Sequence, residues 1–294
     1  MTEAAAYRVD APLVEPASTT GLLEVVRRRY LLKLLVRREV LARYSGSVLG
    51  LMWSYINPLS QFFIYFVVMG ILFNLHKSVQ NFAIHMFAGL VVVHFFAETL
   101  NAGTRSIVRN RAVVQKMAVP REMFPVASML VSGYHAIPSI VIMAVAGLVV
   151  GWLPDPVGVL AGLLGFAITI AFATSLALVF SVANVFLRDI SNGVNVLTNF
   201  IRFSVPMIYP YTLVAVRFHG HTDLYLCNPL AIAVLLVQRC FWVGSTDHPA
   251  LTMKTDMPDY LYLRGGIMLL ISLVMVVVAQ LIFSRYQNRI PERL

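Results

Sequence analysis

The sequence predicts an all-α integral membrane protein with six transmembrane helices. Of its 294 residues, 59% are hydrophobic and 13% are charged, and the mean hydropathy of +0.76 is far above what a water-soluble core requires. Six apolar stretches approach or exceed the roughly 20 residues that cross a bilayer. They cover residues 59–75, 82–100, 123–153, 157–187, 194–216 and 265–283.

Lys and Arg are distributed unequally between the two sides of these spans. Seventeen of the 23 basic residues lie in the N-terminal arm, in the loop 105–121, at Arg188 or in the C-terminal tail, whereas four lie on the opposite side. Because cytoplasmic segments are enriched in Lys and Arg, we expect both termini to be cytoplasmic. No nucleic-acid-binding module accompanies the net charge of +9, so we expect an anionic membrane surface and not nucleic acid as the partner of these cations.

The first 57 residues divide into two predicted units that precede the membrane domain. Residues 1–20 contain Pro12 and Pro16 and lack an apolar core of about 7 to 15 residues, so we expect a disordered leader and not a secretory signal. Residues 21–57 form a cytoplasmic arm that leads into the bilayer, and residues 58–294 form the six-span domain.

A helix is predicted over residues 22–41, where Leu and Val are mixed with six basic residues. Long basic side chains can lay their stems on an apolar surface and lift their charge into water, so this helix is expected to lie along the inner membrane surface. A simple orienting signal is the alternative. Further along, Trp53 and Tyr55 favour the headgroup boundary, and Pro58 is expected to begin the first span because the first helical turn needs no proline N–H.

Residues 229–237 are apolar but too few to cross the hydrocarbon core, so they predict an external or re-entrant helix. A helix after Pro229 would separate Cys227 and Cys240 by roughly 15 to 20 Å. That distance is too long for a disulfide, so two free cysteines are expected. The third and fourth spans exceed the required length and are expected to tilt, or to kink at Pro138.

The sequence predicts no catalytic residue. A phosphate-binding P-loop needs a Gly-Lys step, and the four lysines follow Leu, His, Gln and Met, so ATP hydrolysis by that route is excluded. No Asp-x-Asp, His-Glu-x-x-His or Cys-x-x-Cys motif is present, and no metal site is expected. His219, His221 and Asp223 could meet a metal in a loop, although an ordinary polar turn explains them better.

The loop 105–121 is basic and is followed by Pro125. We predict a short helix over residues 107–116 that ends before Pro120. Such a helix could transmit force from a soluble partner into two spans at once. A solvated basic loop with no further role explains the pattern equally well.

Five motifs, in order along the chain, are similar to those of one family. They are RYSGSVLGLMWSYINP from Arg43, VPRE with FP up to Pro125, LRD at 187–189, PMIYP at 206–210 and CNPL at 227–230. Together they resemble the permease subunits of ABC polysaccharide exporters, the Wzm type, which are related to exporters of O-antigen, teichoic acid and capsule. The resemblance runs from residue 22 to the C-terminus.

The resemblance implies an assembly and a location. It implies a homodimer in the bacterial inner membrane, bound to two copies of a separate P-loop ATPase of the Wzt type. That ATPase would hold ATP and magnesium, so no cofactor is expected in this chain. Residues 22–41, 107–116 and 224–243 would correspond to the interfacial helix, the coupling helix and the external re-entrant helices. The residues expected to contact the ATPase are Arg109, Asn110, Arg111, Val114, Gln115, Lys116, Arg188 and Asp189.

The resemblance also implies a polyprenyl-pyrophosphate-linked polysaccharide as substrate. Our favoured substrate is a lipid-linked galactan, and O-antigen and wall teichoic acid remain open. A pyrophosphate needs cations at the inner surface, and the candidates are Arg27, Arg28, Arg29 and Arg43. Binding of anionic membrane lipid explains these arginines equally well.

A polysaccharide needs a wide channel with aromatic rings that stack on sugars. The residues expected to line it are Phe62, Phe66, Phe95, Phe96, Arg202, Phe203 and Tyr209. Rings that face lipid or neighbouring helices are the alternative. A charge at Arg202 facing lipid would cost several kcal/mol, so this side chain should face the channel, a partner acid or a kinked backbone. Glu98 is expected to pair with an arginine such as Arg105.

Two other functional classes stay open. A small-molecule efflux permease would share the architecture. A membrane enzyme acting on polyprenyl phosphates would need clustered acids or histidines at one membrane face, and the predicted spans contain few carboxylates.

Overall fold

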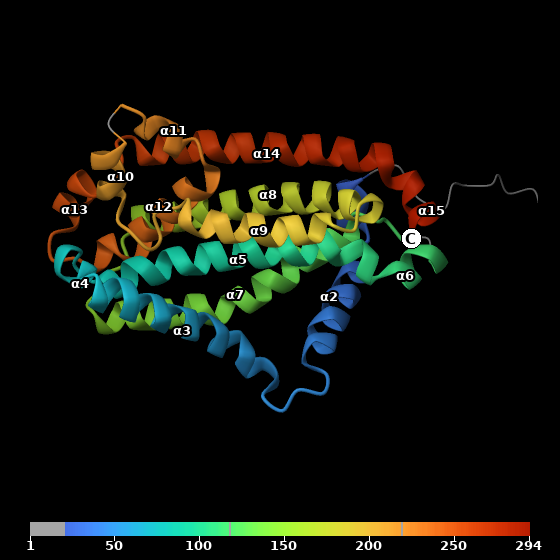
Figure 1. Cartoon of the computed structure of the whole chain (residues 1–294), viewed down its shortest axis with the longest axis horizontal. Helices are drawn as coiled ribbons and strands as arrows, with labels where there is room; N and C mark the ends of the chain where they lie inside the picture. Colours follow the sequence, from blue (N-terminus) through green and yellow to red (C-terminus); the bar gives the residue numbers. More distant parts are fainter. Residues whose placement is uncertain (1–20, 118, 219) are drawn as a thin grey trace, which may run out of the picture.

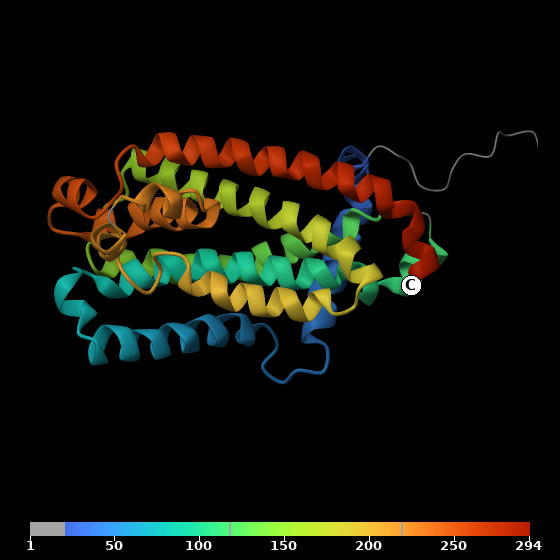
Figure 2. The same cartoon turned by 45° about the horizontal axis from the view of Figure 1, so that its top comes forward.

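The computed structural model describes residues 21–117, 119–218 and 220–294, so the predicted leader and His219 lie outside the described part. The described residues form helices and loops and no strand, which confirms the all-α class. Five helices are long and apolar enough to cross a membrane, and they run side by side along the long axis (Figures 1 and 2). They are α3 with its π-helical continuation η2 (Trp53–Leu72), α5 (Phe82–Arg109), α7 (Met123–Val149), α8 (Pro156–Phe186) and α14 (Leu261–Tyr286), the last prolonged by η4 (Gln287–Arg289) and α15 (Ile290–Arg293).

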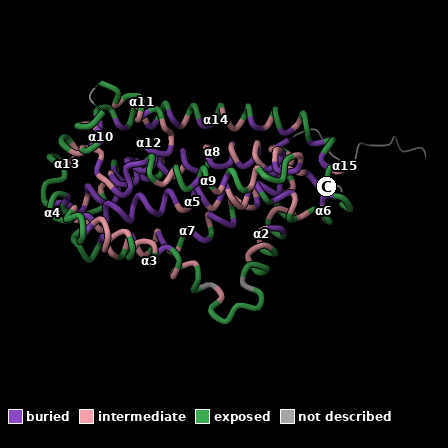
Figure 3. Tube along the Cα trace, in the orientation of Figure 1, coloured by how far each residue is buried: buried purple, intermediate pink, exposed green. Residues whose placement is uncertain are grey.

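Helix α5 is the central helix of the bundle. It packs against α7 and α8, and most of its side chains are buried (Figure 3). Gly103 lets α8 approach closely, since a Cβ added there would lie 2.6 Å from the Cβ of Ala177. Small residues commonly permit such close helix contacts in membranes. The outer helices, in contrast, expose apolar side chains such as Phe63 and Leu281, which suits contact with lipid.

The predicted fifth span, residues 194–216, is not confirmed, because the structure does not form one continuous helix there. Helix α9 (Ile190–Phe203) has 14 residues, and after a non-helical segment the chain forms the short helix α10 (Tyr211–Arg217). A 14-residue helix is about 21 Å long, short of the roughly 30 Å hydrocarbon core. Pro206 and Pro210 lack the N–H groups that would continue the helix. Met207 in this segment is buried against Gly89 of α5.

After α11 (Thr222–Leu226), the short apolar helix α12 (Pro229–Phe241) lies inside the bundle, between α5, α8 and α14. Asn228 caps it by accepting a hydrogen bond from the Leu230 N–H, and Pro229 occupies the first turn, where no N–H is required. All side chains from 230 to 238 are buried, which agrees with the re-entrant alternative. Cys227 and Cys240 are both free, as predicted. The chain continues through η3 (Val243–Ser245) and α13 (Pro249–Thr255).

The N-terminal arm forms α1 (Leu22–Arg27) and α2 (Arg29–Tyr44), and α2 runs obliquely to the long helices (Figure 1). After η1 (Gly50–Met52), α3 begins at Trp53. Pro58 therefore lies inside the helix, and the prediction that it begins the span is wrong. Gly50 has a positive φ of 44°, which glycine adopts without strain, and it turns the chain into η1. Helix α3 follows η1 directly and therefore begins five residues before Pro58.

The predicted coupling helix also has different bounds. Helix α5 continues to Arg109, Asn110 breaks it, and the separate helix α6 (Arg111–Lys116) follows. Residues 107–109 thus belong to the central helix, so the short helix directly continues a long one. Helix α6, the turn between α8 and α9, and the C-terminus lie at the same end of the bundle, called the basic end below (Figure 1). The short helix α4 (Leu75–Ser78) and α12 lie toward the opposite end.

Candidate functional site

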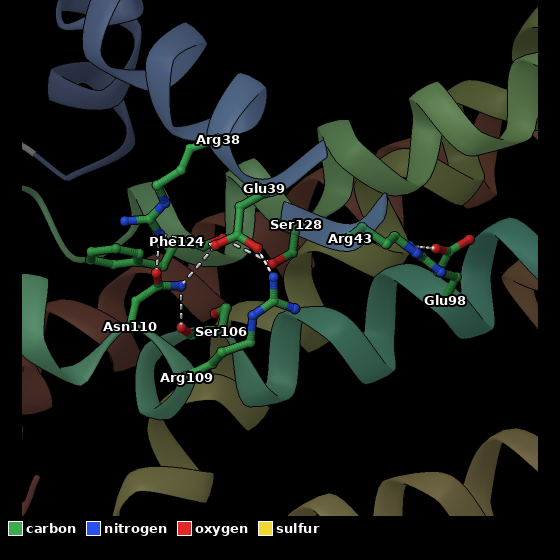
Figure 4. Close-up of polar contacts among 9 residues, drawn as sticks. All are labelled: Arg38, Glu39, Arg43, Glu98, Ser106, Arg109, Asn110, Phe124 and Ser128. Carbon is green, nitrogen blue, oxygen red and sulfur yellow. Dashed lines mark hydrogen bonds and ion pairs between the residues drawn. The ribbon is translucent and has the colours of Figure 1, made fainter. Parts of the chain in front are cut away.

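Two ion pairs join α2 to α5 (Figure 4). Glu39 of α2 pairs with Arg109 of α5, and Arg43 of α2 pairs with Glu98 of α5. Glu39 and Arg43 are four residues apart and therefore share one face of α2. Each helix supplies one acid and one base, so the two pairs set the register between the interfacial arm and the central helix.

Glu39 also holds the junction between α5 and α6. The Asn110 side-chain amide donates to Glu39 Oε1 at 3.3 Å and to the Ser106 carbonyl at 3.0 Å. Arg38 donates to Glu39 Oε1 at 3.0 Å and also to the Asn110 side-chain oxygen. The Glu39 side chain is only 13% exposed. The start of the short helix α6 is thus bound to α2 through one largely buried carboxylate. Only the structure reveals this link.

The structure separates the predicted ATPase-contacting residues into two groups. Arg109 and Asn110 face α2, and Val114 is buried, so these three hold the short helix in place. The other members are exposed, and they are Arg111, Gln115, Lys116, Arg188 and Asp189.

A cavity of about 230 Å³ brings Arg111, Arg188 and Arg293 together at the basic end. It therefore unites α6, the turn between α8 and α9, and the C-terminal helix α15. The contribution of the C-terminus was missed in the sequence, where Arg293 reads only as one more basic residue of the tail.

A larger cavity of about 670 Å³ lies between α2, α5 and α7. Glu98, which the sequence pairs with Arg105, pairs instead with Arg43, because α2 brings Arg43 alongside the middle of α5. Arg105 lines the same cavity. The polar lining comprises Glu39, Arg43, Glu98, Asn101, Arg105, Arg109, Ser128 and Ser132.

The four arginines predicted to bind pyrophosphate do not form one site. Arg28 pairs with Glu24 at 2.6 Å, and Arg27 and Arg29 are exposed on the α1–α2 segment. Arg43 lies 14 residues beyond Arg29 on one continuous helix, which places the two about 21 Å apart along its axis. Only Arg43 lies at the cavity.

Four of the predicted channel aromatics occupy two kinds of position. Phe95 and Phe96 are buried, and Phe96 stacks on Phe172 of α8 with ring centroids 5.4 Å apart. Phe62 and Phe66 of the α3–η2 helix are half-buried and stack with centroids 5.8 Å apart. Rings in the first group pack between helices of one chain, whereas those in the second are partly accessible.

The remaining predicted channel residues lie where α9 ends. Phe203 is exposed, and the Tyr209 hydroxyl donates to its carbonyl at 2.9 Å. Arg202 is half-buried in the last turn of α9. This group therefore surrounds the break in the predicted fifth span. No cluster of three or more His, Cys, Asp or Glu side chains suited to a metal ion occurs among the described residues.

The VPRE motif joins the loop after α6 to α14. The buried Glu122 carboxylate accepts a hydrogen bond from the Gln280 amide at 3.0 Å, and Arg121 donates to the Gln287 carbonyl. Burial lowers the pKa of the Arg121 guanidinium from its usual value, and the neighbouring Glu122 carboxylate opposes that shift. The motif thus anchors the basic loop to the last long helix.

Comparisons with known proteins match most of the chain. Residues 30–242 match the family described as ABC-2 type transporters. The O-antigen export system permease protein RfbA of Myxococcus xanthus is 27% identical over 226 residues, which cover 74% of this chain and 83% of that protein. The protein of the same name from Klebsiella pneumoniae is 24% identical over 266 residues, covering 89% of this chain and 94% of its own length.

Proposed function

The chain belongs to the family of ABC-2 type transporters, and we propose that it exports a polyprenyl-pyrophosphate-linked polysaccharide across the bacterial inner membrane. It is a transporter permease and not an enzyme. Lipid-linked galactan is the favoured substrate, with O-antigen and teichoic acid as the other candidates. The observation that carries the proposal is the similarity to O-antigen export permeases over 89% of the chain.

Energy for export would come from two copies of a separate P-loop ATPase, which bind ATP and magnesium. In this proposal the ATPase contacts the exposed side chains of α6 together with Arg188 and Asp189. Because α6 directly follows α5, a displacement of α6 moves the central helix. The Glu39 ion pair with Arg109 then carries the same displacement to α2. The sequence supports this division of labour, since it contains no Gly-Lys step.

The substrate would pass between two copies of the chain. The residues accessible enough to line such a path are Phe62 of α3, Phe66 at the start of η2, Arg202 and Phe203 at the end of α9, and Tyr209 in the segment that follows α9. Phe95 and Phe96 would support it from behind, because both are buried between helices. In this proposal Phe95 and Phe96 therefore support the path and do not touch the substrate.

Both termini would be cytoplasmic. The C-terminus lies at the basic end beside α6, and the cluster of Arg111, Arg188 and Arg293 at that end agrees with the enrichment of basic residues in cytoplasmic segments. The opposite end, with α12 and α13, would face the outside. A tag on the C-terminus that labels from outside intact cells would contradict this orientation.

The proposal is tested by purifying the permease together with its ATPase. We expect a stable complex whose ATP turnover is stimulated by lipid-linked galactan, and we expect Arg111→Glu to weaken the complex because it places an acid on the docking helix. Arg217→Glu, an exposed substitution on α10 far from the basic end, is the matched control. If small hydrophobic compounds stimulate ATP turnover and glycans do not, the chain is a small-molecule efflux permease instead.

A further inference from the structure

Arg105 is the arginine of the α2–α5–α7 cavity whose charge is not balanced. The two carboxylates that line the cavity are each paired, Glu39 with Arg109 and Glu98 with Arg43. Arg105 lines the cavity between these two pairs and forms no ion pair with any described residue. The lining therefore carries one excess positive charge, and this charge favours an anion in the cavity.

A buried hydroxyl group points to a ligand independently of that charge. Ser132 of α7 lines the same cavity and is 1% exposed, and its Oγ has no hydrogen-bond partner among the described residues. A buried polar atom without a partner destabilises the folded state. A ligand with oxygen acceptors would satisfy this hydroxyl.

The spacing on α5 directs the polar groups toward one place. Asn101, Arg105 and Arg109 follow one another at intervals of four residues and thus share one face of the helix. Two of the three already have partners, since Asn101 donates to the Ala97 carbonyl at 2.9 Å and Arg109 pairs with Glu39. Arg105 is the remaining donor on this face. Its planar guanidinium can give two parallel hydrogen bonds to phosphate oxygens.

We propose that this cavity binds the phosphate group of a lipid ester, with Arg105 and the Ser132 hydroxyl as donors. The inference rests on the proposed function, in which that lipid is the carrier of the exported glycan, and it places the anion site between α2, α5 and α7, away from residues 27–29. The two ion pairs flank the site and hold α2 against it.

Binding of farnesyl pyrophosphate to the purified permease–ATPase complex in phosphatidylcholine nanodiscs tests this inference. We expect Arg105→Gln to weaken binding about 10- to 100-fold, because it removes the positive charge and leaves a neutral amide that can replace only one of the two hydrogen bonds. Arg105→Lys should restore part of the affinity, since it retains the charge without the planar fork. Ser132→Ala should weaken binding about 5-fold through the loss of a single neutral donor. Arg217→Gln on α10 is the matched control and should bind as the unmodified complex does.

Two further measurements are needed. One distinguishes a lipid-linked phosphate from a free phosphate, and the other distinguishes binding at the cavity from the export function. Inorganic pyrophosphate should bind at least about 10-fold more weakly than farnesyl pyrophosphate, because it lacks the apolar chain; equal affinity would overturn the lipid assignment. Every variant is first checked for an intact complex with the ATPase. If the unmodified complex responds to lipid-linked glycan while Arg105→Gln binds farnesyl pyrophosphate normally, the cavity inference fails and the export function stands.

Discussion

The contact between Gly103 of α5 and Ala177 of α8 yields the sharpest prediction about stability. A Cβ added at Gly103 would lie 2.6 Å from the Ala177 Cβ and 3.5 Å from its Cα. Relaxed carbon atoms sit about 3.5 to 4.0 Å apart, so Gly103→Ala forces the two central helices apart by about 1 Å. Overpacking of this kind costs about 1–3 kcal/mol.

Helix propensity opposes that cost. Replacing glycine by alanine within a helix stabilises it by up to about 1 kcal/mol. Gly266 of α14 has no atom within 4 Å of an added Cβ, so Gly266→Ala reports propensity alone and serves as the matched control. We therefore expect Gly103→Ala to be less stable than Gly266→Ala by about 1–3 kcal/mol.

Denaturation of the purified permease in one detergent, followed by tryptophan fluorescence or by loss of the monodisperse peak, measures this difference. Ala177→Gly makes room for the added methyl group, so the double variant should recover most of the overpacking cost in a double-mutant cycle. Equal stability of Gly103→Ala and Gly266→Ala, or no recovery in the double variant, would refute the close packing of α5 on α8.

Three further predictions concern the junction, α12 and α9. Glu39→Gln removes the ion pair with Arg109, and it should change the free energy of unfolding by less than about 1 kcal/mol because the pair is partly exposed. It should lower the amount of glycan exported per ATP hydrolysed. An unchanged ratio of export to hydrolysis would contradict the proposed link between α2 and α6. Gln238→Leu removes the amide that donates to the Pro206 carbonyl at 2.8 Å; we expect a loss of about 1–3 kcal/mol in the same denaturation assay, and unaltered stability would argue against this buried contact. Arg202→Ala should impair export while the complex with the ATPase still assembles, and normal export would contradict a role in the channel.

Much of the fold is determined locally and was predictable. The span expected at 157–187 is observed as Pro156–Phe186. A long apolar run that follows a proline forms an α-helix in lipid, because only a helix satisfies the backbone hydrogen bonds within one segment. The errors fall where local signals compete. Pro58 can begin a helix or be tolerated inside one, and the sequence alone does not decide between these uses. In the predicted fifth span, Pro206 and Pro210 interrupt an apolar run whose hydropathy still favours a crossing.

Composition and charge distribution by themselves determined that the chain is a multi-pass membrane protein and that its basic residues gather at one end. They also predicted a short, non-crossing helix after Pro229, because nine apolar residues cannot cross a bilayer whatever they pack against. Tertiary structure alone decided which charges meet. Arg43 and Glu98 are 55 residues apart and Glu39 and Arg109 are 70 apart, and hydrophobic periodicity carries no information about partners at such separations. The packing of α2 across α5 selects these pairs and leaves Arg105 without an ion pair among the described residues. Helix crossing, and not sequence spacing, sets the distances over which these charges interact.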